Sequence, residues 1–177
     1  ESGKPSMLRY PKAACPSEHI AFSAPLVEGR GVFVHQNRAP QCIIFTGSLY
    51  PQVDETVRLL EAEGYPCDSY NLRFIKPLDE DYLISVMRGY KQIVVVEEGV
   101  KNGGIGEYLG IVLSHHVSTI AFLNLGSYDT FHAQATRKEL LAQNKLDSKG
   151  LSEQIKTFLN STIQNEYYSD VLRVVGK

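Results

Sequence analysis

The stretch Gln92-Ile93-Val94-Val95-Val96-Glu97-Glu98, followed shortly by Gly103-Gly104-Ile105-Gly106, decides the fold of this chain. Its first part is a continuous apolar run, which is typical of a strand that is covered on both faces. The glycines predict a turn, and the apolar residues that follow recur at helical spacing: Tyr108, Leu109, Val112 and Leu113. The stretch therefore predicts a strand, a tight turn and a helix, which together form most of a βαβ unit.

The same pattern recurs on both sides of this stretch. Further strands are predicted at residues 41–46, 67–72 and 118–123, and the alternating residues 31–35 indicate an edge strand. Helices are predicted from Val53 to a C′ glycine at Gly64, after an N-cap at Asp79, and at residues 137–143 and 148–163. Strands that alternate with helices at short intervals predict an α/β fold, with a mostly parallel sheet and helices on both faces.

The two ends of the chain differ from this middle part. Residues 1–24 are rich in proline and small residues and read as a linker, in which residues 7–10 form a short strand-like run stopped by Pro11. Residues 25–165 are the predicted domain. Residues 166–177 form a tail whose only pattern, around Val171–Val175, suggests a late strand or a docking segment. Because the chain starts at Glu1 rather than at Met, we expect it to be part of a longer protein.

Composition narrows the functional classes. A net charge of −2 gives no electrostatic reason to expect a nucleic-acid partner. No apolar run approaches the roughly 20 residues of a membrane helix, so we expect no membrane contact. Cys15, Cys42 and Cys67 match no zinc or redox spacing, and reduced thiols are the expected state. His115 and His116 are neighbours on a predicted helix and point in different directions, so no metal site is predicted there.

The glycine turn and the two glutamates before it are the first candidates for chemistry. The backbone N–H groups of Gly103–Gly106 could hold a phosphate at the start of the following helix. The glycine spacing fits a dinucleotide fingerprint poorly, and Glu97, Glu98 and Glu107 place negative charge nearby. A tight turn with close helix–strand packing is therefore the favoured interpretation. For Glu97 and Glu98 a structural role is favoured over acid–base catalysis: accepting backbone N–H bonds, or bonding across a subunit interface.

Two cationic segments are the second set of candidates. Arg9 is followed by an aromatic residue and a proline in an extended segment. Its guanidinium is suited to bind a phosphate or carboxylate through two donors. Arg73 and Lys76 leave the end of a predicted strand toward the edge of the sheet where ligands bind. The alternative for Arg73 is a solvated loop in which it pairs with a neighbouring carboxylate, and the sequence does not separate the two.

Taken together, these segments resemble the last domain of the transketolase superfamily. The resemblance rests on Leu72-Arg73-Phe74-Ile75-Lys76-Pro77-Leu78-Asp79 and on Val95-Val96-Glu97-Glu98 with the glycine turn. Within the superfamily, Leu8-Arg9-Tyr10-Pro11-Lys12 is similar to an Arg-Tyr-Pro-Arg segment of the 1-deoxy-D-xylulose-5-phosphate synthase family. The segments Leu123–Gly126, Asp129-x-Phe131, Thr136–Leu141 and Leu146–Leu151 resemble the closing part of that family. The resemblance spans residues 6–159.

This resemblance implies a fold and a reaction. The fold is a three-layer αβα domain with a mostly parallel five-stranded sheet and one antiparallel edge strand, and residues 1–24 include the end of a preceding pyrimidine-binding domain. In the reaction, pyruvate and glyceraldehyde 3-phosphate give 1-deoxyxylulose 5-phosphate and carbon dioxide, which makes the whole protein a transketolase-type transferase. Thiamine diphosphate and Mg²⁺ belong to other domains, so the resemblance implies that this part binds no cofactor or metal and is inactive alone.

The resemblance also implies site residues and partners. Arg9 matches an arginine that contacts the acceptor's phosphate, with Tyr10 beside it as a further substrate-binding candidate. The partners are the remaining domains of the same enzyme, a second copy in a homodimer and a small phosphorylated sugar, and the expected compartment is the cytoplasm. The chain departs from the family pattern at Lys12, Ala13, residues 30–39 and residues 132–135. These departures bear on the substrate more than on the fold.

Alternatives of other kinds stay open at this point. The chain could be the last domain of another transketolase-like enzyme or of a 2-oxoacid dehydrogenase β subunit, which have a similar Leu-Arg-x-x-x-Pro-Leu-Asp turn. It could also be a non-catalytic α/β binding or assembly module. The hypothesis of a nucleotide-binding oxidoreductase rests on the glycine turn alone.

Overall fold

Five strands form one mixed sheet in the computed structural model, which describes residues 5–8, 10, 14–116 and 120–175, with side chains up to residue 162. The strands are β1 (Val32–His35), β2 (Gln41–Phe45), β3 (Asp68–Asn71), β4 (Gln92–Val100) and β5 (Ala121–Ser127). They lie in the order β1-β3-β2-β4-β5. Only β1 pairs antiparallel, with β3, and the other pairs are parallel. The predicted parallel sheet with one antiparallel edge strand is confirmed.

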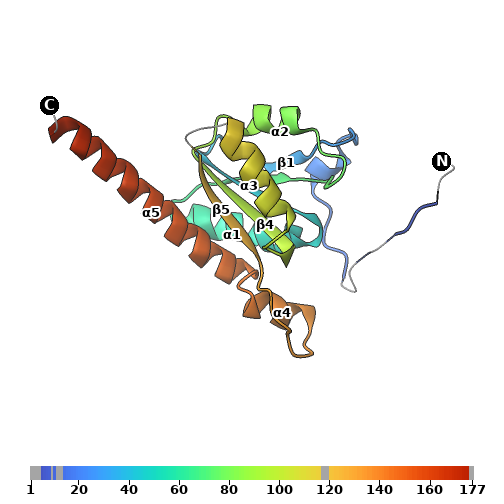
Figure 1. The fold of residues 1–177 in the computed structure, drawn as a ribbon. Coiled ribbons are helices and arrows are strands. Elements are labelled where there is room, and N and C mark those ends of the chain that lie inside the picture. Colours follow the sequence, from blue (N-terminus) through green and yellow to red (C-terminus); the bar gives the residue numbers. More distant parts are fainter. Residues whose placement is uncertain (1–4, 9, 11–13, 117–119, 176–177) are drawn as a thin grey trace.

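Helices cover both faces of this sheet, as Figure 1 shows. The helices are α1 (Tyr50–Ala62), α2 (Glu80–Met87), α3 (Ile105–His116), α4 (Arg137–Gln143) and α5 (Ser148–Val175), with short 3₁₀ turns η1 (Ile20–Ser23) and η2 (Gly47–Leu49). Along β2 and β4 alternate side chains point to opposite faces. Ile43, Phe45, Val94 and Val96 meet α1, α4 and α5, whereas Cys42, Ile44, Ile93 and Val95 meet α2 and α3. The result is the predicted three-layer αβα arrangement.

The helix termini carry the signals that the sequence predicted. Asp79 is the N-cap of α2, and its side chain accepts the N–H of Tyr82 at 3.0 Å. Gly64 follows α1 with φ +85°, a left-handed conformation that glycine adopts without steric cost. Thr136 and Glu139 also form a reciprocal capping box at the start of α4, which the sequence analysis did not predict. At these capped termini the predicted helix boundaries lie close to the observed ones.

Three predicted boundaries were wrong. The strand predicted at residues 92–97 continues to Val100, because β4 keeps pairing with β5 as far as Ser127. The strand predicted at residues 118–123 is β5, displaced to Ala121–Ser127; residues 118 and 119 lie outside the described residues. The end of the helix predicted at residues 148–163 and the late strand suggested for the tail are also wrong, since α5 runs without interruption to Val175.

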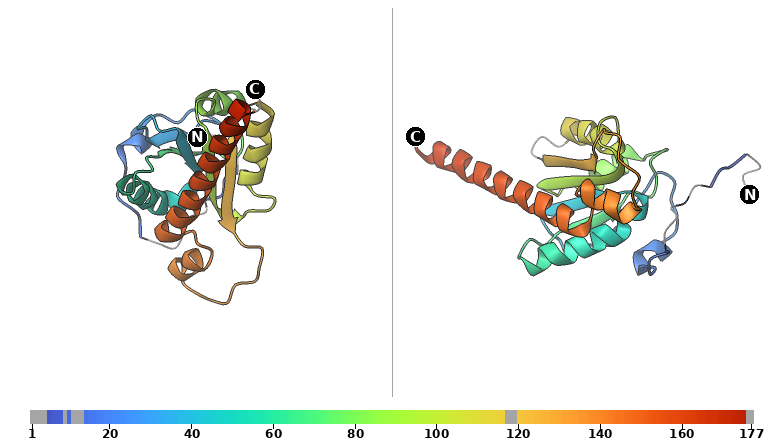
Figure 2. Two further views of the ribbon diagram at one scale, coloured as in Figure 1. Left: turned by 90° about the vertical axis from the view of Figure 1, so that its left-hand side faces the viewer. Right: turned by 90° about the horizontal axis from the view of Figure 1, so that it is seen from below.

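The two ends of the chain lead away from the sheet. The first part of α5 packs on α1, where Leu151, Ile155 and Leu159 are buried, and its far end projects beyond the body (Figures 1 and 2). The described N-terminal residues lead away on the opposite side (Figure 2). Met7, Leu8 and Tyr10 belong to no strand, so the strand-like run predicted there is absent from the described residues. Arg9 lies outside them.

Candidate functional site

The carboxyl ends of β2, β3, β4 and β5 gather most of the polar residues that the sequence singled out. In parallel sheets this edge is where ligands usually bind. Here it is formed by η2 after β2, the loop between β3 and α2, the turn between β4 and α3, and the loop from β5 to α4. The side chains at this edge decide what the domain can do chemically.

Glu97 lies on β4, its side chain faces the start of α3, and it is only 5% exposed. Its carboxylate accepts the N–H of Gly106 at 2.9 Å and the N–H of Ile105 at 3.2 Å. A negative charge at this position also interacts favourably with the helix dipole. A Cβ at Gly104 would collide with the same carboxylate, so only glycine allows this approach. The structural role predicted for Glu97, accepting backbone N–H bonds, is confirmed.

The close helix–strand packing predicted at the glycine turn is found one residue further along. A Cβ at Gly106 would collide with the side-chain amide of Asn124 on β5. The Asn124 amide donates to the carbonyl of Lys101 at 3.1 Å and thus fixes the other end of the turn. Because the Glu97 carboxylate already takes up two N–H groups at the start of α3, this turn does not fit a phosphate or diphosphate. The tight-turn interpretation is therefore confirmed.

Glu98 points to the other side and pairs with a residue distant in sequence. Arg137 donates from Nε to Oε1 at 2.9 Å and from Nη2 to Oε2 at 2.8 Å, a two-pronged ion pair. The Ser48 hydroxyl donates to Oε2 at 2.7 Å. The Arg137 hydrogen bonds hold the pKa of Glu98 below its ordinary value, and the Ser48 bond adds to this. Glu98 is thus an ionised clamp between β4, η2 and α4, and its partner lies within the same chain rather than across an interface.

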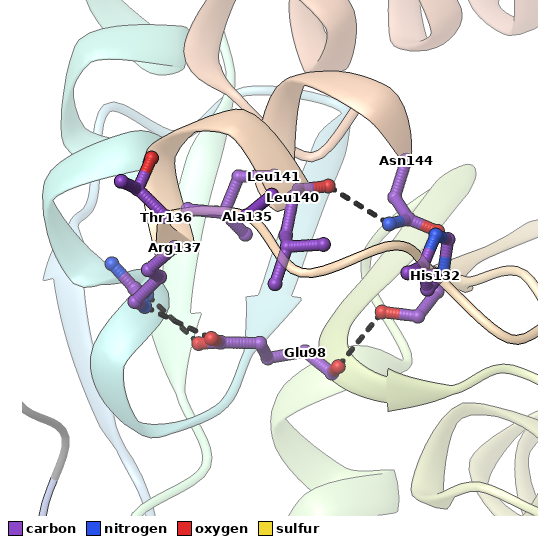
Figure 3. A pocket seen from close by; sticks show the side chains of 9 residues that line it. Glu98, His132, Ala135, Thr136, Arg137, Leu140, Leu141 and Asn144 are labelled. Carbon is purple, nitrogen blue, oxygen red and sulfur yellow. Dashed lines mark hydrogen bonds and ion pairs between the residues drawn. The ribbon is translucent and has the colours of Figure 1, made fainter.

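A pocket of about 700 Å³ opens beside this ion pair (Figure 3). Its lining residues come from β4, β5, α4 and the loop before α4: Glu98, Ser127, His132, Ala135, Thr136, Arg137, Leu140, Leu141 and Asn144. The opposite charges of Glu98 and Arg137 neutralise one another in its wall, and the lowered pKa of Glu98 makes this carboxyl group unsuited to act as a general acid. The wall of the pocket thus contains a structural ion pair and not a catalytic acid–base pair.

Arg73 follows neither of the two predictions made for it. Among the described residues, its guanidinium pairs with no carboxylate. It donates instead to main-chain carbonyls of the N-terminal segment, those of Ala21, Phe22, Ala24 and Pro25. Lys76 is exposed at the same loop. The sequence could not reveal this contact, because the acceptors are backbone atoms about 50 positions away.

The substrate-binding candidates, Arg9 and Tyr10, precede the domain in the sequence. Arg9 is outside the described residues. Tyr10 is described and is 79% exposed. Their roles in substrate binding therefore stay predictions.

A Ser–His–Asp arrangement, which the sequence did not suggest, lies near the amino ends of the strands. The His35 ring nitrogen Nε2 is 3.2 Å from Oδ1 of Asp54, and Nδ1 is 2.8 Å from the Ser69 hydroxyl. Desolvation is the main reason why the pKa of His35 is lowered, so the ring is neutral; it donates to Asp54 and accepts from Ser69. Ser69 is fully buried, so no substrate can reach its hydroxyl. The arrangement therefore has a structural role and not a catalytic one: it links β1, β3 and α1.

Among the residues that the structure describes, no three histidine, cysteine or acidic side chains come together in a way that could hold a metal ion. No helix there combines the length and the apolar character that crossing a membrane requires.

The fold and this edge define a class of protein. Residues 32–151 match the family described as the C-terminal domain of transketolase, and the chain belongs to that family. Curated relatives over most of the chain carry one name, 1-deoxy-D-xylulose-5-phosphate synthase. That of Treponema pallidum (strain Nichols) is 34% identical over 160 residues, or 90% of this chain, and that of Histophilus somni (strain 2336) is 31% identical over 157 residues, or 89%. The resemblance recognised in the sequence is thereby confirmed.

The share of the relatives that is matched is small. The chain spans 25% of the length of the Treponema relative and 24% of the Histophilus relative. Among solved structures, a split-gene transketolase described as an inactive β4 tetramer gives a TM-score of 0.71 at 24% identity, covering 81% of this chain and 46% of that one. A mutant transketolase from Pichia stipitis gives a TM-score of 0.56 at 20% identity, covering 75% of this chain and 18% of that one. At these identities the structures support the fold alone.

Proposed function

We propose that this chain is the C-terminal domain of a 1-deoxy-D-xylulose-5-phosphate synthase. The proposal is carried by the curated relatives with that name, which match about nine tenths of the chain. The whole enzyme joins two carbons of pyruvate to glyceraldehyde 3-phosphate, so that two three-carbon substrates give one five-carbon sugar phosphate and carbon dioxide. This product is a precursor for isoprenoids, thiamine and pyridoxal. We expect the enzyme in the cytoplasm, in keeping with the free thiols of Cys42 and Cys67.

Thiamine diphosphate would supply the carbanion chemistry of this reaction, with Mg²⁺ holding its diphosphate. The residues of this chain do not fit that group. Glu97 takes up N–H groups at the start of α3, and the described residues bring no metal-ligand cluster together. We therefore assign both cofactors to other domains and expect the isolated chain to be inactive.

A calorimetric titration of this chain with thiamine diphosphate and Mg²⁺ tests that assignment. We expect no heat of binding. Stoichiometric binding would place the cofactor site in these residues and would overturn the assignment.

Arg9 and Tyr10 are the proposed contribution of the chain to substrate binding. A guanidinium with two parallel donors suits the dianionic phosphate of glyceraldehyde 3-phosphate, and the neighbouring Tyr10 is exposed and available to a ligand. Their position before the domain fits a place at the junction with the preceding domain. The large apolar side chains of Met7 and Leu8 are almost fully exposed in this chain, as expected for a segment that packs against another domain.

Arg9→Ala in the full-length enzyme tests this role. We expect the Michaelis constant for glyceraldehyde 3-phosphate to rise while that for pyruvate changes little, because only the acceptor carries a phosphate. Loss of a charged hydrogen bond costs roughly 1.5–3 kcal/mol, which corresponds to about a 10- to 150-fold change. Arg9→Lys keeps the charge but loses the paired donors, so it should show a smaller rise. Unchanged constants in both variants would remove Arg9 from the site.

The proposed homodimer contacts are supported by apolar side chains beside α2 and α3. Ile75, Tyr108 and Ile111 are each more than 40% exposed. Ile111→Lys should weaken dimerisation of the full-length enzyme, measured by light scattering after size-exclusion chromatography. An unchanged dimer at low micromolar concentration would exclude this face.

A further inference from the structure

A side chain from the loop between β3 and α2 binds the main chain of the segment His19–Pro25 to the domain. Arg73 donates from Nη1 to the carbonyl oxygens of Ala24 at 3.1 Å and Pro25 at 3.3 Å. It donates from Nη2 to those of Phe22 at 3.1 Å and Ala21 at 3.3 Å. Carbonyls at the end of a helical turn mostly lack a donor within the turn, although that of Ala21 also accepts the Ala24 N–H at 3.3 Å, and a cationic donor interacts favourably with them. One guanidinium thus holds a whole turn of the chain.

The backbone of Arg73 indicates that this side chain has a particular use. Its φ is +52°, in the left-handed region that costs an ordinary residue free energy and that glycine or asparagine would enter more easily. The conformation is held by its own N–H, which donates to Oδ1 of Asn71 at 3.1 Å. Leu72 continues the strand by donating to the carbonyl of Phe45 at 2.9 Å. An arginine in a strained position that aims its donors at one segment is consistent with selection for that contact.

A ring cluster provides the second contact of this segment. Phe22 meets Tyr50 of α1 edge-on, with ring centroids 5.1 Å apart, and His19 lies 6.3 Å from the same ring. The Nδ1 atom of His19 accepts the N–H of Ala21 at 3.2 Å and closes the turn. The rings orient the turn, while Arg73 binds its main chain.

We propose that Arg73 is a positioning residue that fixes where the N-terminal segment leaves the domain, and so limits the positions open to Arg9. The link to the reaction rests on the proposed function. Arg9 lies ten positions before His19, the first residue of the held turn. If both contacts of that turn are released, the next main-chain hydrogen bond from this segment to the domain, among the described residues, is at Gly29, 20 positions after Arg9, whose carbonyl accepts the Asp79 N–H at 3.0 Å.

The stretch of chain between Arg9 and the first residue held to the domain acts as a tether, and its length sets the expected effect on acceptor binding. The effective concentration of a tethered group falls roughly as the −3/2 power of tether length, so doubling the length lowers it about threefold. We therefore expect release of the turn to weaken acceptor binding about threefold. Because only the approach of Arg9 changes, kcat at saturating acceptor should stay the same.

The first test uses this chain alone and does not depend on the proposed function. Arg73→Asn suits the left-handed backbone but removes the guanidinium. We expect amide hydrogen exchange of residues 20–24 to become at least roughly tenfold faster, since hydrogen bonds to a charged group are lost, while β2 and β4 keep their protection. Arg38→Asn is a matched control, because Arg38 is an exposed arginine with φ +60° in another loop. Equal exchange of residues 20–24 in wild type and Arg73→Asn would overturn the proposal.

The second test measures kinetics in the full-length enzyme. Arg73→Asn should raise the Michaelis constant for glyceraldehyde 3-phosphate about threefold, with kcat and the constant for pyruvate unchanged. Arg73→Lys, which retains the charge but not the paired donors, should lie between wild type and Arg73→Asn. A fall in kcat, or equal effects on both substrates, would reduce Arg73 to a structural role. If Arg9→Ala leaves the Michaelis constant for the acceptor unchanged, the proposed function of Arg9 fails. The proposal that Arg73 holds the segment His19–Pro25 is then still decided by the hydrogen-exchange result.

Discussion

The loop between β3 and α2 and the turn between β4 and α3 leave the same edge of the sheet, and at each of them one charged side chain lies against main-chain groups. Glu97, on β4, turns inward and accepts N–H groups at the start of α3. In the loop after β3, Arg73 turns outward and donates to carbonyls of the N-terminal segment. An anion meets donors in one loop and a cation meets acceptors in the other.

The difference between the two loops lies in access to water. The N–H of Gly106 is buried with Glu97, so removal of the carboxylate takes the acceptor away from a buried donor. Ala24 and Pro25 are exposed, so water can replace Arg73 at their carbonyls. Glu97 therefore contributes to the stability of the fold, whereas Arg73 contributes to the position of a segment.

The largest effect is expected at Glu97. Glu97→Ala leaves two N–H groups without acceptors and should lower the free energy of unfolding by roughly 2–4 kcal/mol, measured by urea denaturation of this chain. Glu97→Gln keeps one acceptor oxygen and loses the charge, so a smaller loss is expected. A loss below about 1 kcal/mol in Glu97→Ala would mean that water reaches the turn, and the contrast between the loops would disappear.

An intermediate effect is expected for the Glu98–Arg137 pair. Both side chains are partly exposed, so Arg137→Ala should cost only about 0.5–1 kcal/mol at neutral pH. The pKa of Glu98 is lowered in the folded state. Its stabilisation is therefore present above the ordinary value of 4.5 and is lost as pH falls through the lowered pKa.

The pH dependence provides the check. Urea denaturation of wild type and Arg137→Ala should differ most at neutral pH and converge once the pH is well below the ordinary carboxyl pKa. A constant difference over that range would show that Arg137 acts through packing rather than through its charge.

The smallest effect on stability is expected at Arg73. Arg73→Asn should change the free energy of unfolding by about 0.5 kcal/mol or less, because relief of the left-handed backbone offsets the lost hydrogen bonds. Thermal and urea denaturation of Arg73→Asn and of wild type would measure this change in the free energy of unfolding. A loss comparable with that of Glu97→Ala would show that the N-terminal segment is part of the folding unit.

Most of the fold could be predicted because local signals agreed with one another. The apolar runs around Ile44 and Val95, the N-cap at Asp79 and the glycine after α1 all point to the same α/β arrangement. Errors arose where pairing rather than composition ends an element. Polar Glu98 and flexible Gly99 read as a loop, yet β4 continues through them because β5 offers it hydrogen-bond partners.

The candidate site was predicted only in part, since its partners are distant in sequence. Glu97 was assigned to backbone N–H groups because the turn follows it directly. The partner of Glu98 lies 39 positions away in α4, and no local pattern connects the two. Arg73 was harder still, because its acceptors are carbonyls, which every residue carries and which leave no trace in the sequence.

The Ser69–His35–Asp54 arrangement has a consequence for how this domain resists separation of its parts. The edge strand β1 joins the sheet antiparallel and is short, so its ladder with β3 offers few hydrogen bonds. The imidazole of His35 adds a cross-link outside the ladder: one nitrogen bonds to β3 and the other to α1. Peeling this edge strand from the sheet would therefore also break a bond to the helix layer, because β1 is tied to two elements instead of one.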